Sequence, residues 1–80
     1  MRYLVYGRST CPFCIAACNF LDASEQEYHF ADFHEDLDFM EYVKGFYEFE
    51  TVPIIIENNK ETGETKMIGG YTDMLDRFQP

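Results

Sequence analysis

The chain has 80 residues, the size of one small domain, so we expect a single domain over residues 1–80. Hydrophobic residues make up 46% of it and aromatic residues 18%, enough to build a core and to exclude a disordered chain. Six Lys and Arg oppose 15 Asp and Glu, giving a formal net charge of −9. Partners rich in phosphate, such as nucleic acids and anionic membranes, are therefore not expected.

The sequence also predicts no targeting or membrane-spanning segment. Apolar runs such as residues 52–56 are far shorter than the roughly 20 residues that a spanning helix needs. The apolar residues after Met1 end at Gly7, which leaves too few for the core of a signal peptide. We therefore expect a cytoplasmic protein without a membrane partner, and we expect it to be a monomer.

The first half of the chain predicts a strand, a helix and a second strand. Residues 2–6 are mainly aromatic or aliphatic and are followed by Gly7, which predicts a strand. Residues 12–23 predict a helix, because Pro12 suits the first helical position and apolar residues recur at helical spacing, at Cys14, Ala17, Cys18 and Leu21. Residues 28–33 predict a second strand, which should run parallel to the first after a right-handed crossover.

The second half predicts a helix, a hairpin and a final helix. Residues 35–46 predict a helix with Phe39, Val43 and Phe46 facing inward and Gly45 marking its end. Strands are predicted over residues 54–56 and 65–68, with turn residues between them, and a last helix follows residues 69–70, capped by Thr72 or Asp73. The order β-α-β-α-β-β-α predicts an α/β fold in which a mixed four-stranded sheet carries helices on its faces.

Three cysteines, Cys11, Cys14 and Cys18, lie within eight positions. An odd, clustered set is a poor disulfide framework for a secreted protein, so catalysis or metal binding is favoured. Cys11 and Cys14 with His29 and His34 match a loose zinc-finger spacing. However, the predicted helix contains Cys14, and the two histidines are an odd number of residues apart, which would turn them to opposite faces of a strand. We therefore expect no metal.

The redox interpretation fits the predicted elements better. A Cys-x-x-Cys motif that follows a strand and opens a helix is a strong indication of thiol–disulfide chemistry. Cys11 would lie at the helix N-terminus, where unpaired N–H groups and the helix dipole stabilise a thiolate, and Arg8 adds positive charge nearby. Cys14, one turn further on, is the natural resolving thiol, which attacks the mixed disulfide formed at Cys11.

Three motifs in order, at residues 7–14 (GRSTCPFC), 51–53 (TVP) and 69–73 (GGYTD), resemble those of a dithiol glutaredoxin. The resemblance covers about residues 1–77 and implies a thioredoxin-like fold. It implies that Cys11 is the nucleophile, that Cys14 is the resolving cysteine and that Pro53 is the family's cis-proline, which faces the disulfide.

The resemblance further implies a binding site for glutathione and for substrate. Thr51, Val52 and Pro53 would present backbone groups to an extended substrate. The γ-glutamyl end of glutathione would be held by Gly70, Tyr71, Thr72 and Asp73, with the Asp73 carboxylate pairing with its ammonium group. Arg8 would attract the glycyl carboxylate or tune Cys11, and Phe13, where the family more often has Tyr, would pack against substrate.

The expected function is thus a glutathione-dependent oxidoreductase that reduces protein disulfides and glutathione mixed disulfides, with glutathione as reductant and co-substrate. Ribonucleotide reductase, which the family serves, is a candidate client. Two alternatives stay open. Glu48 and Glu50, close to Pro53, favour recharging by a thioredoxin reductase. An iron–sulfur carrier would use Cys11 and glutathione thiolates of two subunits, although Pro12 and Cys14 disfavour it.

Cys18 is additional to the motif. It lies one turn after Cys14 on the same apolar stripe, which predicts a buried apolar filler. A redox or regulatory thiol is the alternative, because cysteines at i and i+4 of one helix could pair after modest distortion.

Overall fold

The computed structural model describes residues 1–33 and 36–78. Its four strands are β1 (Arg2–Gly7), β2 (Glu27–Asp32), β3 (Ile54–Asn58) and β4 (Thr65–Gly69), and they form one sheet in the order β2-β1-β3-β4. β1 runs parallel to β2 and antiparallel to β3, and β3 pairs antiparallel with β4. The predicted α/β fold with a mixed four-stranded sheet is therefore confirmed.

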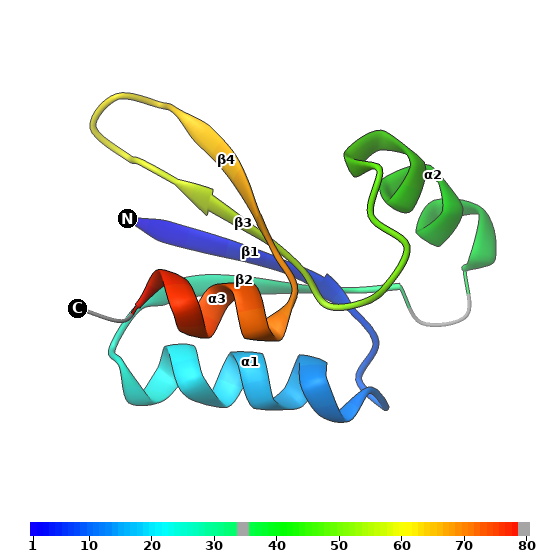
Figure 1. The fold of residues 1–80 in the computed structure, drawn as a ribbon, viewed down its shortest axis with the longest axis horizontal. Coiled ribbons are helices and arrows are strands. Elements are labelled where there is room, and N and C mark those ends of the chain that lie inside the picture. The colour runs from blue at the N-terminus through cyan, green and yellow to red at the C-terminus, as the bar shows by residue number, and fades with distance from the viewer. Residues whose placement is uncertain (34–35, 79–80) are drawn as a thin grey trace.

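The helices lie on both sides of this sheet (Figure 1). α1 (Pro12–Ala23) and α3 (Tyr71–Arg77) lie side by side along one face, and α2 (Leu37–Tyr47) lies on the other side, toward the end of the sheet away from the N-terminus. Among the described residues, no helix is both long and apolar enough to cross a membrane.

Two hydrophobic cores follow from the alternation of side chains along the strands. One core joins α1 and α3 to the sheet and contains Tyr3, Val5, Ala17, Leu21, Ile55 and Met74. The other lies between the sheet and α2 and contains Phe33, Val43, Ile54 and Ile56. Successive residues of β1 and β3 serve opposite cores, so the sheet is buried on both sides where the cores meet it.

α1 has the predicted bounds, and its buried residues are the predicted stripe, with Cys14, Ala17 and Leu21 fully buried. β2 begins and ends one residue earlier than predicted. Phe33, just beyond it, is buried, and its N–H donates to the Gly7 carbonyl at 2.8 Å. The parallel pairing thus continues one bond past the strand end.

The end of α2 differs from the prediction. Gly45 lies inside the helix, which continues to Tyr47, and Glu48 forms the C-cap in the left-handed conformation with φ 53°. The Phe49 N–H then donates to the Lys44 carbonyl at 3.0 Å. Glycine is the usual residue in a left-handed C-cap, which is why Gly45 was predicted to mark the helix end. That prediction is wrong, because Glu48 takes this position. The predicted start at Glu35 lies outside the described residues.

The inward face of α2 was also predicted only in part. Val43 is buried, as predicted, but Phe39 is 40% exposed and Phe46 is 68% exposed. Met40 and Tyr47 also pack against the core. The Phe39 ring lies edge-on to that of the buried Phe33, with ring centroids 5.3 Å apart, so Phe39 faces inward in part. Both sets of residues have helical spacing with Val43, so periodicity alone could not separate the two faces. The result is an exposed aromatic face on α2.

Glu57 is the one charged residue among those described that is buried, at 6% exposure. Its carboxylate accepts hydrogen bonds from the Arg77 guanidinium at 2.6 Å and from the Tyr3 hydroxyl at 3.1 Å. The Arg77 hydrogen bond lowers the pKa of Glu57, and burial raises the pKa of Tyr3 to about 12. This cluster ties α3 to β3 and β1.

We expect Glu57→Gln to lower the free energy of unfolding by about 1 to 3 kcal/mol at neutral pH, because it leaves Arg77 without its carboxylate. A folded-state pKa below the usual 4.5 means that the carboxylate stabilises the fold above that pH. The stabilisation is lost as the pH falls through the folded-state pKa. Urea unfolding at neutral pH and at about pH 3 should therefore show a large difference between the two proteins only at neutral pH.

Glu27→Gln is the matched control. Its carboxylate pairs with Lys60 at 3.0 Å, but both side chains are about half exposed, so solvent screens the pair. This substitution should leave stability almost unchanged. Equal effects of the two substitutions at neutral pH would contradict a stabilising role for the buried cluster.

Candidate active site

The two cysteines of the motif lie at the start of α1, directly after β1 and its connecting loop. Cys11 is the N-cap residue, and its Sγ accepts a hydrogen bond from the Cys14 N–H at 3.3 Å. Pro12 occupies the first turn, where its missing N–H leaves no donor unsatisfied. Cys11 Sγ thus accepts one of the N–H groups that the start of a helix leaves unpaired.

Both thiols are free, but they differ in exposure. Cys11 is partly exposed, whereas Cys14 is completely buried. Burial, followed by the hydrogen bond with Cys11, raises the pKa of Cys14 to about 12. Gly7 makes room for this thiol, since a Cβ at Gly7 would overlap Cys14 Sγ. A substrate can therefore reach Cys11, while Cys14 is held behind it as a protonated thiol.

A hollow of about 430 Å³, the substrate hollow, lies beside the start of α1. The Val52–Pro53 peptide bond is cis, as the resemblance implied. Eight predicted site residues line the hollow together with Phe49: Phe13, Thr51, Val52, Pro53, Gly70, Tyr71, Thr72 and Asp73. Phe13 closes one side, with its ring centroid 6.0 Å from that of Tyr71. Three segments that are far apart in sequence thus meet in one place.

The start of α3 is shaped by two glycines and one carboxylate. Gly70 is the N-cap of α3, and its N–H donates to Asp73 Oδ2 at 2.9 Å. Gly69 has φ 124°, and a Cβ there would overlap the Asp73 carboxylate. The prediction that Thr72 or Asp73 is the N-cap is therefore wrong. Asp73 still takes part in capping, because its carboxylate accepts the N–H of the N-cap residue Gly70. The side chains of Thr72 and Asp73 remain exposed on the rim of the hollow.

Arg8 and Cys11 do not line the substrate hollow in the part of the chain that the structure describes. The Arg8 carbonyl accepts the Cys11 N–H at 3.0 Å, so the backbone of Arg8 helps to position the cysteine. Cys11 adjoins the hollow through Pro12 and Phe13.

Cys18 packs against the core of α1, α3 and the sheet and is half-buried. Burial raises the pKa of this thiol, and the negative charge of Asp22 adds to the effect. Cys18 is thus partly buried, where a buried apolar filler was predicted.

Sequence reasoning did not find Phe49 as a lining residue. Its ring lies close to Gly70, where an added Cβ would be 3.7 Å from the Phe49 ring edge. Phe49 reaches this position because the left-handed Glu48 redirects the chain at the end of α2. The aromatic residue just before the Thr-Val-Pro motif was the available signal.

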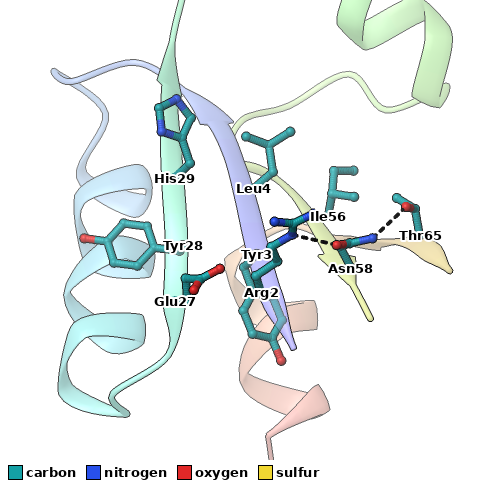
Figure 2. Close-up of a pocket in the computed structure, with 9 residues that line it drawn as sticks. All are labelled: Arg2, Tyr3, Leu4, Glu27, Tyr28, His29, Ile56, Asn58 and Thr65. Atoms are coloured by element: carbon teal, nitrogen blue, oxygen red, sulfur yellow. Dashed lines mark hydrogen bonds between the residues drawn. The ribbon is translucent and has the colours of Figure 1, made fainter. Parts of the chain in front are cut away.

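A second hollow of about 430 Å³ lies beside the first residues of β1, at the other end of that strand. Figure 2 shows Leu4 and Ile56 at this surface. Arg2 Nε donates a hydrogen bond to Asn58 Oδ1 at 2.7 Å, and Asn58 Nδ2 donates one to Thr65 Oγ1 at 3.2 Å. A strand rises about 3.3 Å per residue, so Arg2 is roughly 17 Å from Gly7 at the thiol end of β1. This hollow is therefore separate from the thiol site.

The zinc-finger spacing of the sequence finds no counterpart in the described structure. Cys14 is inside α1, His29 is exposed on β2 and His34 lies outside the described residues. Within residues 1–33 and 36–78, no three His, Cys, Asp or Glu side chains gather as a metal site requires. The cysteines are instead arranged around a helix N-terminus, as thiol chemistry requires.

Comparisons with known proteins agree with this geometry. The glutaredoxin family model matches residues 4–61. A wheat glutaredoxin structure superposes with a TM-score of 0.77 at 21% identity, over 92% of this chain and 66% of that one. Reduced Escherichia coli glutaredoxin gives 0.68 at 26% identity, over 96% and 92% of the two chains.

A further structural match is the glutaredoxin-like protein NrdH-redoxin from Escherichia coli, described by its thioredoxin-like activity profile. It has a TM-score of 0.69 at 18% identity, over 100% of this chain and 97% of that one. Comparison with curated protein sequences finds no significant match. With the thioredoxin-like fold, the Cys11–Cys14 site and a family model covering most of its length, the chain belongs to the glutaredoxin family and is a thiol–disulfide oxidoreductase.

Proposed function

We propose that this protein is a dithiol glutaredoxin that reduces protein disulfides and glutathione mixed disulfides and is recharged by glutathione. The observation that carries the proposal is the pairing of a partly exposed Cys11, whose Sγ accepts the Cys14 N–H, with a fully buried Cys14. This pairing provides one thiol for attack and a second for release.

In the first step, the Cys11 thiolate attacks one sulfur of the substrate disulfide and displaces the other sulfur as a thiolate. Cys14 Sγ then attacks Cys11 Sγ, so the Cys11–Cys14 disulfide forms and the bond from Cys11 to the substrate breaks. The proton of the Cys14 thiol, retained at neutral pH because its pKa is raised to about 12, passes to the departing substrate thiolate. The substrate gains two electrons, and the protein loses two.

Glutathione would restore the dithiol in two steps. One glutathione thiolate attacks Cys11 Sγ, which leaves glutathione bonded to Cys11 and frees Cys14 as a thiolate that takes up a proton from solvent. A second glutathione attacks the sulfur of the bound glutathione, which releases the Cys11 thiolate and glutathione disulfide. Both electrons come from glutathione, the reductant that the family uses.

Glutathione would occupy the substrate hollow. Its γ-glutamyl group would lie at Gly70, Tyr71, Thr72 and Asp73, where the exposed Asp73 carboxylate can pair with the ammonium group. Its backbone would extend along Thr51 and Val52, and Phe13 would cover it from the other side. Arg8 supplies a positive charge beside Cys11 for the glycyl carboxylate. Ribonucleotide reductase, a client of the family, is a candidate protein substrate.

The acidic residues near the hollow favour a second candidate, recharging by a thioredoxin reductase. Glu48 and Glu50 are both exposed and flank Phe49, at an edge where negative charge disfavours anionic glutathione. The fold likeness to NrdH-redoxin, with its thioredoxin-like activity profile, supports the same candidate.

Reduction of a small glutathione mixed disulfide, coupled through glutathione reductase to NADPH consumption, tests the proposal. We expect sustained NADPH consumption that depends on the protein concentration. Turnover only when thioredoxin reductase replaces glutathione and its reductase would favour the second candidate. No turnover with either reductant would overturn both.

A further inference from the structure

A second recess adjoins the substrate hollow and has a different character. It has a volume of about 520 Å³ and lies at the C-terminal end of α2; we call it the acidic recess. Its lining consists of Glu41, Lys44, Gly45, Glu48, Phe49 and Glu50. Phe49 also lines the substrate hollow, so the two hollows meet at this ring.

The acidic recess carries unbalanced negative charge. Glu41, Glu48 and Glu50 are exposed, and Lys44 is the one cation in the lining. Within residues 1–33 and 36–78, none of the three carboxylates forms a hydrogen bond or an ion pair. They are therefore available to a partner of opposite charge.

Backbone hydrogen bonds fix the positions of residues 48 and 49 at the end of α2. The Glu48 N–H donates to the Gly45 carbonyl at 3.3 Å, and the Phe49 N–H donates to the Lys44 carbonyl at 3.0 Å. These bonds close the last turn of α2 around the left-handed Glu48 and place Glu48 and Glu50 on either side of Phe49. The backbone thus places Glu48 and Glu50 next to Phe49, the residue that the acidic recess shares with the substrate hollow.

The aromatic ring of the acidic recess itself is Phe49, and further rings are exposed elsewhere on α2 and beside Cys11. Tyr42 is 70% exposed and Phe46 68% exposed on α2, with ring centroids 6.4 Å apart, and Phe13 is 61% exposed beside Cys11. Grouped exposed aromatic residues mark interaction surfaces, and their faces attract Lys and Arg side chains. Within the acidic recess, the unpaired carboxylates and the Phe49 ring match a cationic polypeptide.

We propose that the preferred protein substrate has a cationic segment next to its disulfide, which passes over Phe49 and docks in the acidic recess. This inference rests on the proposed function, because it requires that Cys11 attacks the substrate disulfide. Charge complementarity accelerates encounter and selects against anionic substrates. The acidic recess thereby determines substrate choice, while the substrate hollow and the thiols carry out the exchange.

The test uses pre-reduced protein and two peptides, each closing a disulfide, that differ only in whether the flanking residues are lysines or glutamates. Single-turnover reduction is followed by rapid quenching and mass spectrometry. We expect the lysine peptide to react roughly tenfold faster at low ionic strength, with the difference shrinking as salt is added. Equal rates for the two peptides would overturn the proposal.

Glu48→Lys/Glu50→Lys should remove the preference for the lysine peptide. Glu48→Gln/Glu50→Gln, which keeps the side-chain size, should also lower the preference for the lysine peptide. This variant replaces the first one in the test if the first does not fold. The matched control is Glu25→Lys/Glu64→Lys, since it changes the net charge equally and Glu25 also has a left-handed backbone, with φ 57°, after a helix. An equal loss of preference in this control would show that net charge alone is responsible and would overturn the proposal.

This experiment separates the inference from the proposed function. Single turnover needs no recharging, so a protein that glutathione cannot recharge would still show the charge preference. Conversely, a glutathione-recharged protein that reduces both peptides equally would retain its proposed function and lose the acidic recess as a docking site.

Discussion

Replacing Cys11 by serine is expected to abolish reduction of every disulfide substrate, with the rate falling by about a thousandfold or more. A serine hydroxyl at the N-cap keeps the hydrogen-bond acceptor for the Cys14 N–H, so the fold should be unaffected. It cannot form a disulfide with substrate, however, and the buried Cys14 cannot take over. Single-turnover assays on the folded variant measure the loss, and substantial residual activity would show that another thiol attacks.

Cys14→Ser should give a different result, because Cys14 acts only after attack. The variant should still reduce a small glutathione mixed disulfide, since a second glutathione can release Cys11. With a protein disulfide it should stop at the mixed disulfide, which mass spectrometry would detect as a covalent adduct on Cys11. Cys18→Ser is the control and should retain both activities, because Cys18 packs against the core. Loss of activity in that control would assign Cys18 a redox role.

Gly69→Ala is expected to lower the free energy of unfolding by about 2 to 4 kcal/mol. At φ 124° an L-residue is strained, and its Cβ would overlap the Asp73 carboxylate that accepts the Gly70 N–H. Displacing Asp73 should also weaken the γ-glutamyl site, so KM for a glutathione mixed disulfide should rise. Urea unfolding and steady-state kinetics measure the two effects.

Gly63→Ala is the matched control for this substitution. Gly63 also has a positive φ, 76°, but a Cβ there would meet open space. We expect a loss of about 1 kcal/mol or less and unchanged kinetics, because the β3–β4 turn is far from the thiols. If both alanine variants lost stability equally and kept the same KM, the steric role of Gly69 at the site would be refuted.

Much of the fold was predictable from local patterns. α1 is the best example: Pro12 fixes its start, and the apolar stripe that begins with Cys14 fixes the buried face. The parallel β1–β2 pair and the β3–β4 hairpin were predicted from one crossover and one short turn, but the pairing of β1 with β3, which sets the strand order, was not. The predicted features depend on residues close together in sequence, where periodicity and turn chemistry are informative.

α2 shows where such reasoning fails. Its apolar residues could face inward on either of two overlapping stripes. In the structure Met40 and Tyr47 pack against the core, and Phe39 contacts Phe33 while remaining 40% exposed. The left-handed conformation of Glu48 has no sequence signal either, because glutamate is uncommon there. The acidic recess depends on both features, so it became visible only in three dimensions.

The candidate site lies between these extremes. Its three motifs were recognised in the sequence. They come together in the fold because β1 pairs with β3 and β3 pairs with β4. That pairing brings the Pro53 segment and the start of α3 to the side of Phe13. Phe49 joined them without having been predicted, because its position follows from the end of α2.

The unequal exposure of the two thiols has a practical consequence for chemical labelling. An electrophile added to the reduced protein meets Cys11 at the surface, whereas Cys14 is shielded by the protein and remains protonated at neutral pH. One equivalent of a bulky alkylating reagent should therefore mark Cys11 and not Cys14. With Cys18 replaced by serine, a reporter dye or an affinity handle can be attached to Cys11 while Cys14 stays in place.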